Sequence, residues 1–141
     1  MDIEFGNAGA LDTNDTGWFL GFSDWARANI AGVADLRFMA KNSLAHTIHA
    51  KWMAHPKGDD RGVAKPPSDG RTISILVSES GTFRLEFSAD KNFPAGQVTA
   101  HTLQKHGDFV IWGEGIHHRW FVDEACVILT FRWIPVQPCI G

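Results

Sequence analysis

The chain has 141 residues, 44% of them hydrophobic, which suffices for one domain with a substantial core and makes a disulfide framework or a structural zinc unnecessary for folding. Thirteen basic and sixteen acidic residues give a net charge of -3, and neither sign forms long blocks, so we expect neither nucleic acid nor an anionic membrane as a partner. No apolar run approaches the roughly 20 residues that span a bilayer, and the acidic start MDIEFGNAG is unlike a signal peptide, which predicts a cytoplasmic protein.

The amino-terminal residues 1–17 are rich in glycine, asparagine and aspartate, which favour turns, and they predict an irregular arm. The remaining residues, 18–141, then form a single domain. Within it the segment SDWARANIAGVADLRFMA, residues 23–40, permits one short helix, because Ser23 or Asp24 could cap it.

Strand signals begin at Ala45. In HTIHAKWMAH, residues 46–55, side chains alternate between two faces. One face carries His49, Lys51, Met53 and His55, and the other carries Ile48, Ala50, Trp52 and Ala54. The following residues 56–70 contain three prolines and three glycines and predict a long loop of the kind that often carries function.

The segment RTISILVSESGTFRLEF, residues 71–87, consists of two alternating runs around SESG and predicts a β-hairpin. Shorter strand-like runs follow in VTAHTL, FVIW, HRWFV and ACVILTFRWI, with turn residues between them. Many short strands spaced by turns predict an all-β sandwich or barrel. Cys126 and Cys139 match no metal or disulfide pattern, so we expect two buried or inert thiols.

The stretch GDFVIWGEGIHHRW, residues 107–120, is either part of a metal site or a tight corner of a barrel. It resembles the second motif of cupins. Gly107 opens the motif, Gly113-Glu114-Gly115 stands where Pro-x-Gly is usual, His118 takes the histidine position, and Val122 replaces the asparagine.

The resemblance extends from about Gly17 to Pro135 and is closest to small bacterial single-domain cupins, on the segments GWFLG, HPKGDDR, RTISILVS, FRLEF and VILTFRW. It implies a cupin-type double-stranded β-helix, or jelly-roll barrel, with a pocket. The first cupin motif should supply His-x-His and a glutamate as metal ligands, and the chain has no His-x-His. The resemblance therefore implies a cupin whose usual metal cage is lost or rebuilt, and a homodimer that covers sheet edges.

Two histidines are candidates for the site. His118 is either a metal ligand, a donor to a bound acid, or a half-buried histidine that bonds to backbone. His55 stands at the mouth of the long loop and is our second candidate. His117 points the opposite way from His118, and His49 lies six residues from His55, roughly 20 Å along a strand and too far to share an ion with it.

Other residues could complete a pocket for a small anion. Trp120 shares a face with His118 and either lines the pocket or fills the core. Arg61, Arg71 and Arg132 could each hold a carboxylate or phosphate by two parallel hydrogen bonds, or could be surface charges paired with Asp59, Asp60 or Glu86.

Two functions remain open from the sequence. The first is binding of a small polar or anionic molecule among His118, His55, Trp120 and the arginines, without the standard cupin metal. The alternative is a metal-dependent enzyme, similar to a dioxygenase or an isomerase. In it His118 and a rearranged set drawn from His55, His49, His101 and Glu86 would bind iron, manganese, nickel or zinc.

Overall fold

The computed structural model describes residues 1–22, 33, 35–39, 45–61 and 66–136, and these residues form eleven strands. The strands are β1 (Ile3–Asn7), β2 (Leu20–Gly21), β3 (Arg37–Phe38), β4 (Ala45–His55), β5 (Asp60–Arg61), β6 (Arg71–Leu76), β7 (Thr82–Ser88), β8 (Thr99–Leu103), β9 (Asp108–Trp112), β10 (His117–Glu124) and β11 (Cys126–Pro135). No helix occurs in these ranges, which confirms the predicted all-β class. The described residues therefore contain no helix long and apolar enough to span a membrane.

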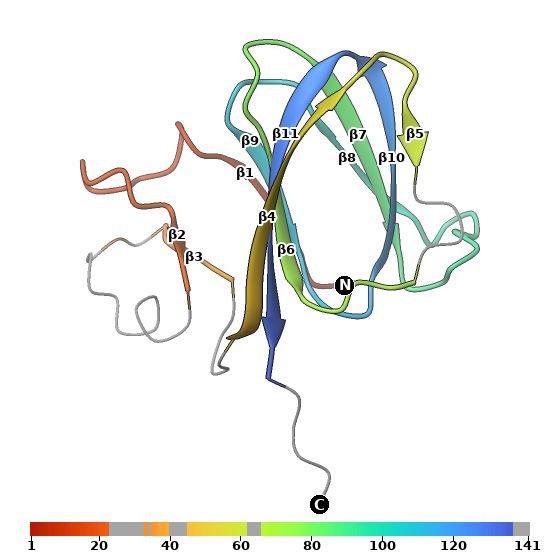
Figure 1. Cartoon of the computed structure of the whole chain (residues 1–141), viewed down its shortest axis with the longest axis horizontal. Coiled ribbons are helices and arrows are strands. Elements are labelled where there is room, and N and C mark those ends of the chain that lie inside the picture. The colour runs from red at the N-terminus through yellow and green to blue at the C-terminus, as the bar shows by residue number, and fades with distance from the viewer. Residues whose placement is uncertain (23–32, 34, 40–44, 62–65, 137–141) are drawn as a thin grey trace, which may run out of the picture.

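Two antiparallel sheets face each other and enclose the barrel (Figure 1). The five-stranded sheet has the order β1-β9-β6-β11-β4, and the four-stranded sheet has the order β5-β10-β7-β8. Large apolar side chains from both sheets fill the space between them; Trp112, Phe87 and Leu85 are each at most 1% exposed. β4 and β5 are edge strands of the two sheets.

A second apolar layer lies on the outside of the five-stranded sheet. Met39 packs there against Ile73, Ile75 and Phe109, and Phe19, Leu20 and Phe22 pack against the same cluster. β2 and β3 lie beside this face of the sheet (Figure 1). Phe22, which follows β2, stacks on Trp133 of β11 with ring centroids 5.4 Å apart. The alternation along β6 and β11 therefore buries apolar residues on both faces of the sheet.

Three predictions about local structure need correction or lie outside the described residues. Residues 3–7 of the predicted irregular arm form β1, which pairs with β9 along its whole length. β6 and β7 do not form a hairpin, since β6 pairs with β9 and β11 whereas β7 pairs with β8 and β10. The segment of the predicted short helix falls mostly outside the described residues, and its described part contains the strand β3.

Candidate functional site

A pocket lies between the two sheets on the side of β4. Its enclosed part has a volume of about 20 Å³, which is room for about one water-sized particle. Its walls are formed by Lys51, Met53, His55, Ser74, Phe83, Leu85, Trp112, His118, Trp120, Ile128, Thr130 and Arg132.

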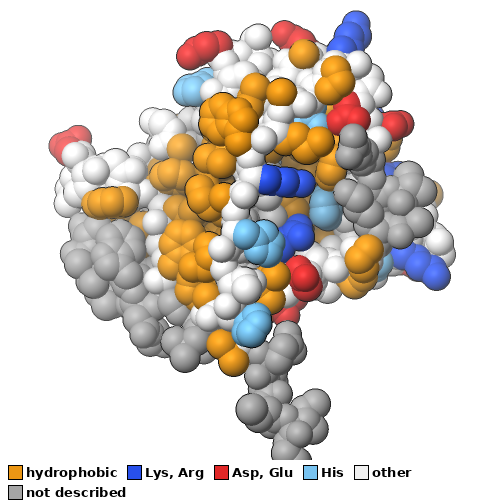
Figure 2. Space-filling model, in the orientation of Figure 1, with side chains coloured by type: hydrophobic (Ala, Val, Ile, Leu, Met, Phe, Trp, Pro, Cys, Tyr) orange, Lys and Arg blue, Asp and Glu red, His pale blue; other side chains and the backbone are white. Residues whose placement is uncertain are grey.

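The walls of this pocket carry basic side chains and no described acidic one. Lys51 and His55 come from β4, His118 from β10 and Arg132 from β11. Figure 2 shows Lys, Arg and His side chains gathered around the hollow on this face of the molecule. A cluster of basic groups in a partly enclosed site favours an anion over a cation or a neutral molecule.

His55 is held in place by a carboxylate behind it. The side chain is 4% exposed, and its Nδ1–H donates to Oδ2 of Asp59 at 2.8 Å. The turn after β4 makes this contact, because the backbone N–H of Asp59 returns to the carbonyl of Pro56 at 3.1 Å and Gly58 adopts a φ of 87°. The carboxylate thereby fixes the tautomer and orientation of the imidazole.

His118 and Trp120 share the inward face of β10, as predicted, and both line the pocket. The His118 ring lies 5.0 Å from the Trp112 ring and 6.0 Å from the Trp120 ring, measured between centroids. The His55 and Trp120 rings are arranged edge to face with their centroids 5.5 Å apart, and Nζ of Lys51 lies 5.5 Å from the centre of the Trp120 ring. Trp120 therefore connects both histidines and the lysine in one cluster.

Polar groups of β6 and β11, on the wall that faces β10, complete the site. Arg132 donates from Nε to Oγ1 of Thr72 at 2.8 Å, and its Nη1 lies 3.9 Å from the exposed carboxylate of Asp69. The hydroxyls of Ser74 and Thr130 bond to each other at 2.8 Å. Trp112 lines the pocket, and its buried indole N–H donates to no residue within the described part of the chain.

The stretch GDFVIWGEGIHHRW forms β9, a corner and β10. Ser68 holds the corner, because its hydroxyl donates to the carbonyl of Gly113 at 2.6 Å and its carbonyl accepts from the N–H of Gly115 at 2.8 Å. Gly115 has a φ of 76°, which an L side chain rarely adopts. The stretch is thus a barrel corner that delivers one histidine, His118, to the pocket.

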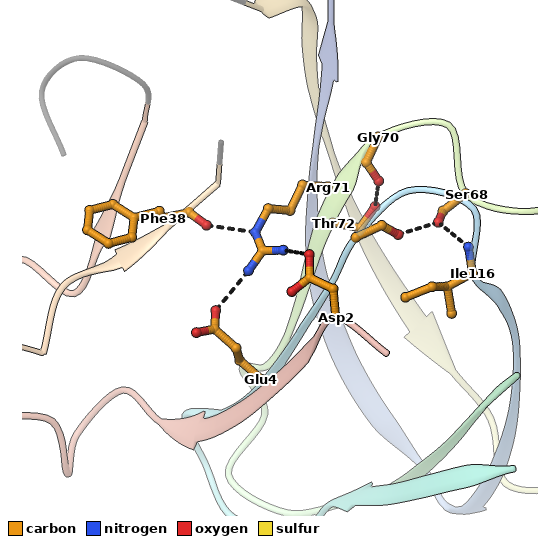
Figure 3. Close-up of polar contacts among 9 residues, drawn as sticks. Asp2, Glu4, Phe38, Ser68, Gly70, Arg71, Thr72 and Ile116 are labelled. Atoms are coloured by element: carbon orange, nitrogen blue, oxygen red, sulfur yellow. Dashed lines mark hydrogen bonds and ion pairs between the residues drawn. The ribbon is translucent and has the colours of Figure 1, made fainter. Parts of the chain in front are cut away.

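Arg71 does not line the pocket, contrary to its inclusion among the predicted site residues. Its guanidinium lies on the outside of the barrel, where it binds the carboxylate of Asp2, donates to Oε2 of Glu4 at 2.9 Å and donates to the carbonyl of Phe38 at 2.8 Å (Figure 3). It ties the end of β6 to the edge strand β1 of the same sheet and to β3 outside it. Arg61 lies in β5 opposite Trp120, and its side chain is outside what the structure describes.

The other candidate ligands lie apart from the two pocket histidines. His49 is exposed on β4. His101 of β8 stacks on Phe5 of β1 with ring centroids 4.0 Å apart, so this contact joins an edge strand of one sheet to an edge strand of the other. Burial lowers the pKa of His101, against the raising effect of Asp108. Glu86 binds Arg84 and Arg119 on the outer face of the four-stranded sheet.

The described pocket wall does not provide the ligands of a standard cupin metal site. A catalytic metal site normally has three protein ligands and one open position. Here His55 and His118 are the histidines of the pocket wall, and the described lining contains no carboxylate or cysteine. Nowhere in the described ranges do three His, Cys, Asp or Glu side chains converge for an ion.

Eight of the lining residues were not among the predicted site residues, and Lys51 and Trp112 are two of them. Lys51 could have been found, because the alternation along residues 46–55 already places it on the face of His55. Trp112 sits in the run FVIW, whose strand pattern gives no sign of whether its indole N–H has a partner. That property depends on the packing of β9 against β10.

Comparison with known proteins gives structural matches only. No family model and no curated protein matches the sequence. The 2-hydroxyethylphosphonate-bound, Fe(II)-bound HEPD of Streptomyces albus superposes with a TM-score of 0.50 at 14% identity, over 67% of this chain and 20% of that one. The conserved protein SPY1581 of unknown function from Streptococcus pyogenes superposes with a TM-score of 0.50 at 18% identity, over 64% of this chain and 67% of that one.

A third match is RmlC of Streptococcus suis in complex with dTDP-D-xylose, with a TM-score of 0.46 and 11% identity over 64% of this chain and 45% of that one. The chain spans only about a fifth of the length of HEPD. At these identities the likeness concerns the fold alone. The two superpositions at a TM-score of 0.50 and the two facing antiparallel sheets show the jelly-roll fold that cupins have, which confirms the predicted fold class.

Proposed function

We propose that the barrel pocket binds a small anionic molecule. The observation that carries the proposal is the composition of the pocket wall, in which Lys51, His55, His118 and Arg132 face one cavity and no described acidic side chain lines it. Positive charges gathered on one small cavity repel each other and are stabilised together by a bound negative charge.

The roles of the basic residues follow from how each is held. Arg132 is fixed at Nε by Thr72, so its terminal nitrogens can present two parallel N–H groups to an oxyanion. Its exposed contact with Asp69 at 3.9 Å is weak and easily exchanged for a ligand. Lys51 adds a second positive charge, and Trp112 offers one neutral N–H donor.

The size of the cavity restricts the ligand. A volume of about 20 Å³ accepts one compact group. The bound group is therefore a carboxylate or a similar small oxyanion that places one oxygen in the enclosed part, while the remainder of the molecule stays at the mouth. The homodimer and the cytoplasmic location predicted from the sequence stay predictions.

Thermal unfolding in the presence of sodium acetate or sodium phosphate tests the proposal, with sodium chloride at equal ionic strength as the reference. A ligand at a hundredfold excess over its Kd stabilises the folded state by about 2.7 kcal/mol, and we expect a rise of several degrees in Tm with at least one probe. The K51Q and R132Q variants should lose this rise.

The matched control is R84Q. Arg84 lies on the outer face of the four-stranded sheet in contact with Glu86, so its loss should leave the anion-dependent rise unchanged. A rise that persists in both K51Q and R132Q, or that chloride reproduces in full, contradicts an anion site in the pocket.

Elemental analysis of protein purified without chelator or histidine tag tests the alternative of a metal-dependent enzyme. The absence of a third ligand in the described pocket wall argues against it. We expect no stoichiometric iron, manganese, nickel or zinc. Near one equivalent of a metal that disappears in H118A would overturn the proposal of a metal-free anion site.

A further inference from the structure

A buried pair of a histidine and a carboxylate borders the pocket, and the binding of an anion does not by itself require it. His55 is the last residue of β4, is buried, and lies in the pocket wall. Asp59 accepts a hydrogen bond from Nδ1 of His55 at 2.8 Å and is not part of that wall. The histidine therefore stands between the carboxylate and the pocket.

The second ring nitrogen of His55, Nε2, determines what this side chain can do. A hydrogen bond from Nδ1–H to a carboxylate leaves the neutral imidazole with a lone pair on Nε2. The two nitrogens of the ring point in different directions, so Nε2 faces away from Asp59 and toward the pocket. Within the described part of the chain, Nε2 has no hydrogen-bond partner. His55 is thus a base that is held in one orientation and offers its lone pair to the pocket.

The neighbours of His55 hold its ring and bring a positive charge close to it. Its centroid lies 5.0 Å from that of Phe83 and 5.5 Å from that of Trp120. Nζ of Lys51 also lies 5.5 Å from the centre of the Trp120 ring. A molecule that packs against Trp120 can therefore meet Nε2 of His55 with one atom and the ammonium group of Lys51 with another. A positioned base and a positive charge on one molecule are the two parts that general-base catalysis uses.

The hydrogen bonds of the pocket wall restrict the reaction that His55 supports. The hydroxyls of Ser74 and Thr130 bond to each other at 2.8 Å, and within the described residues neither hydroxyl is bonded to His55, so the histidine activates no hydroxyl as a nucleophile. Proton transfer with the bound molecule remains. Removal of a proton from a carbon beside a carbonyl group moves negative charge onto the carbonyl oxygen, where nearby positive charges stabilise it.

A substrate for this reaction has to carry both a negative charge and an acidic C–H group. A 2-oxo acid meets both needs, because its carboxylate suits the basic side chains of Lys51 and Arg132 and its keto group acidifies the hydrogens on the next carbon. The hollow measured together with its open mouth is about 360 Å³, so a small 2-oxo acid fits there when one of its oxygens takes the enclosed part.

We propose that the pocket catalyses proton transfer at the carbon beside the keto group of a small 2-oxo acid, with His55 as the base and Asp59 as its positioning residue. The C–H bond breaks and the proton goes to Nε2 of His55. The electron pair of that bond forms a C=C bond, and the carbonyl π electrons move to the keto oxygen, beside Lys51 and Arg132. Return of a proton from Nε2 to the same carbon completes the exchange, so no oxidant or reductant is needed. The step rests on the proposed anion site, which binds the carboxylate.

Proton NMR of sodium pyruvate in D₂O tests the proposal on the full chain. The methyl signal decays as deuterium replaces hydrogen, and we expect the protein to accelerate this decay over buffer alone. H55Q should lower the protein-dependent rate at least about 100-fold. D59N should lower the maximal rate at least about tenfold at an unchanged half-saturating concentration of pyruvate, because Asp59 orients the base and does not touch the substrate. K51Q should raise the half-saturating concentration.

The matched control is H117Q, since His117 belongs to β10 but lies outside the described pocket wall; it should keep the full rate. Circular dichroism checks that each variant is folded. An unmodified chain that gives no exchange above buffer, or an H55Q variant that keeps the rate, overturns the proposal. A rise in Tm with pyruvate but no exchange overturns the proton transfer alone and leaves the anion site standing. Neither exchange nor an anion-dependent rise in Tm overturns both.

Discussion

Cys126 lies in the wall of the inner core, where it packs as an apolar side chain. Burial raises the pKa of its thiol to about 11, and the negative charges of Asp59 and Glu124 add to this effect. The thiolate is the reactive form of cysteine. At neutral pH this residue is therefore an inert part of the core, buried as the sequence predicted.

The raised pKa of Cys126 predicts a loss of stability in alkali. Below a pH of about 9 the thiol keeps its proton in both states. As the pH rises from about 9 to about 11, the unfolded thiol ionises while the folded thiol does not, so the free energy of unfolding falls. Urea unfolding at a series of pH values should show this fall. The C126A variant should lack the part of the fall that ionisation of the Cys126 thiol causes.

The control for this experiment is C139S, which retains Cys126 as the single thiol of the chain. An aromatic disulfide reagent should modify this variant slowly when it is folded and rapidly in urea. Two outcomes would contradict a buried Cys126 with a raised pKa. One is an equal alkaline loss of unfolding free energy in the unmodified chain and in C126A, and the other is fast modification of folded C139S at neutral pH.

At the scale of the element, the turn between β6 and β7 depends on Gly81. Its φ is 142°, and a Cβ at this position would lie 2.4 Å from Cβ of Cys126 and 3.0 Å from the carbonyl oxygen of Ala125. The turn has to pass close to the start of β11 because it connects the two sheets. Only a residue without a side chain fits there.

We expect G81A to destabilise the fold by about 3 kcal/mol, from backbone strain and overpacking together. The control G96A has a φ of 83° with no atom within 4 Å of the added Cβ, so it should cost only the backbone strain, about 1 to 2 kcal/mol. Chemical denaturation of both variants gives the comparison. Equal losses would show that the contact with Cys126 is of no consequence.

The sequence predicted the individual strands more fully than it predicted which strands pair with each other. Alternation over residues 46–55 sorted the side chains of β4 onto two faces and put His55 with Lys51, and the cupin motif register placed His118 as the pocket histidine. The same alternation in residues 71–87 could not tell a hairpin from a crossing between sheets, because both bury one face of each strand.

Long-range contacts explain most of what the sequence did not reveal. The glycine and asparagine of β1 favour turns and predicted an irregular arm, yet β9 and the ion pairs of Arg71 with Asp2 and Glu4 hold this strand in the sheet. Those partners are 69 and 67 residues away from Arg71 in the chain. No local pattern distinguishes such an arginine from one that binds a ligand.

At the scale of the whole molecule, the five-stranded sheet separates two apolar clusters. The inner cluster, which includes Leu76 and Trp120, borders the pocket. The outer cluster, which includes Met39 and Trp133, lies beneath the segment with β2 and β3. Both clusters draw on the side chains of the same strands, β6, β9 and β11, so neither should unfold without disturbing the other.

This arrangement predicts one cooperative unit. Met39 is fully buried, and M39A should lower the free energy of unfolding by about 2 to 5 kcal/mol because it removes apolar contacts and leaves a cavity. Unfolding in urea should remain a single transition, with the same midpoint by tryptophan fluorescence and by circular dichroism, and with an unchanged slope. L76A, in the inner cluster, is the matched variant and should behave alike. If M39A instead produced a separate early transition while L76A did not, the segment with β2 and β3 would be an independent layer whose loss the barrel and its pocket survive.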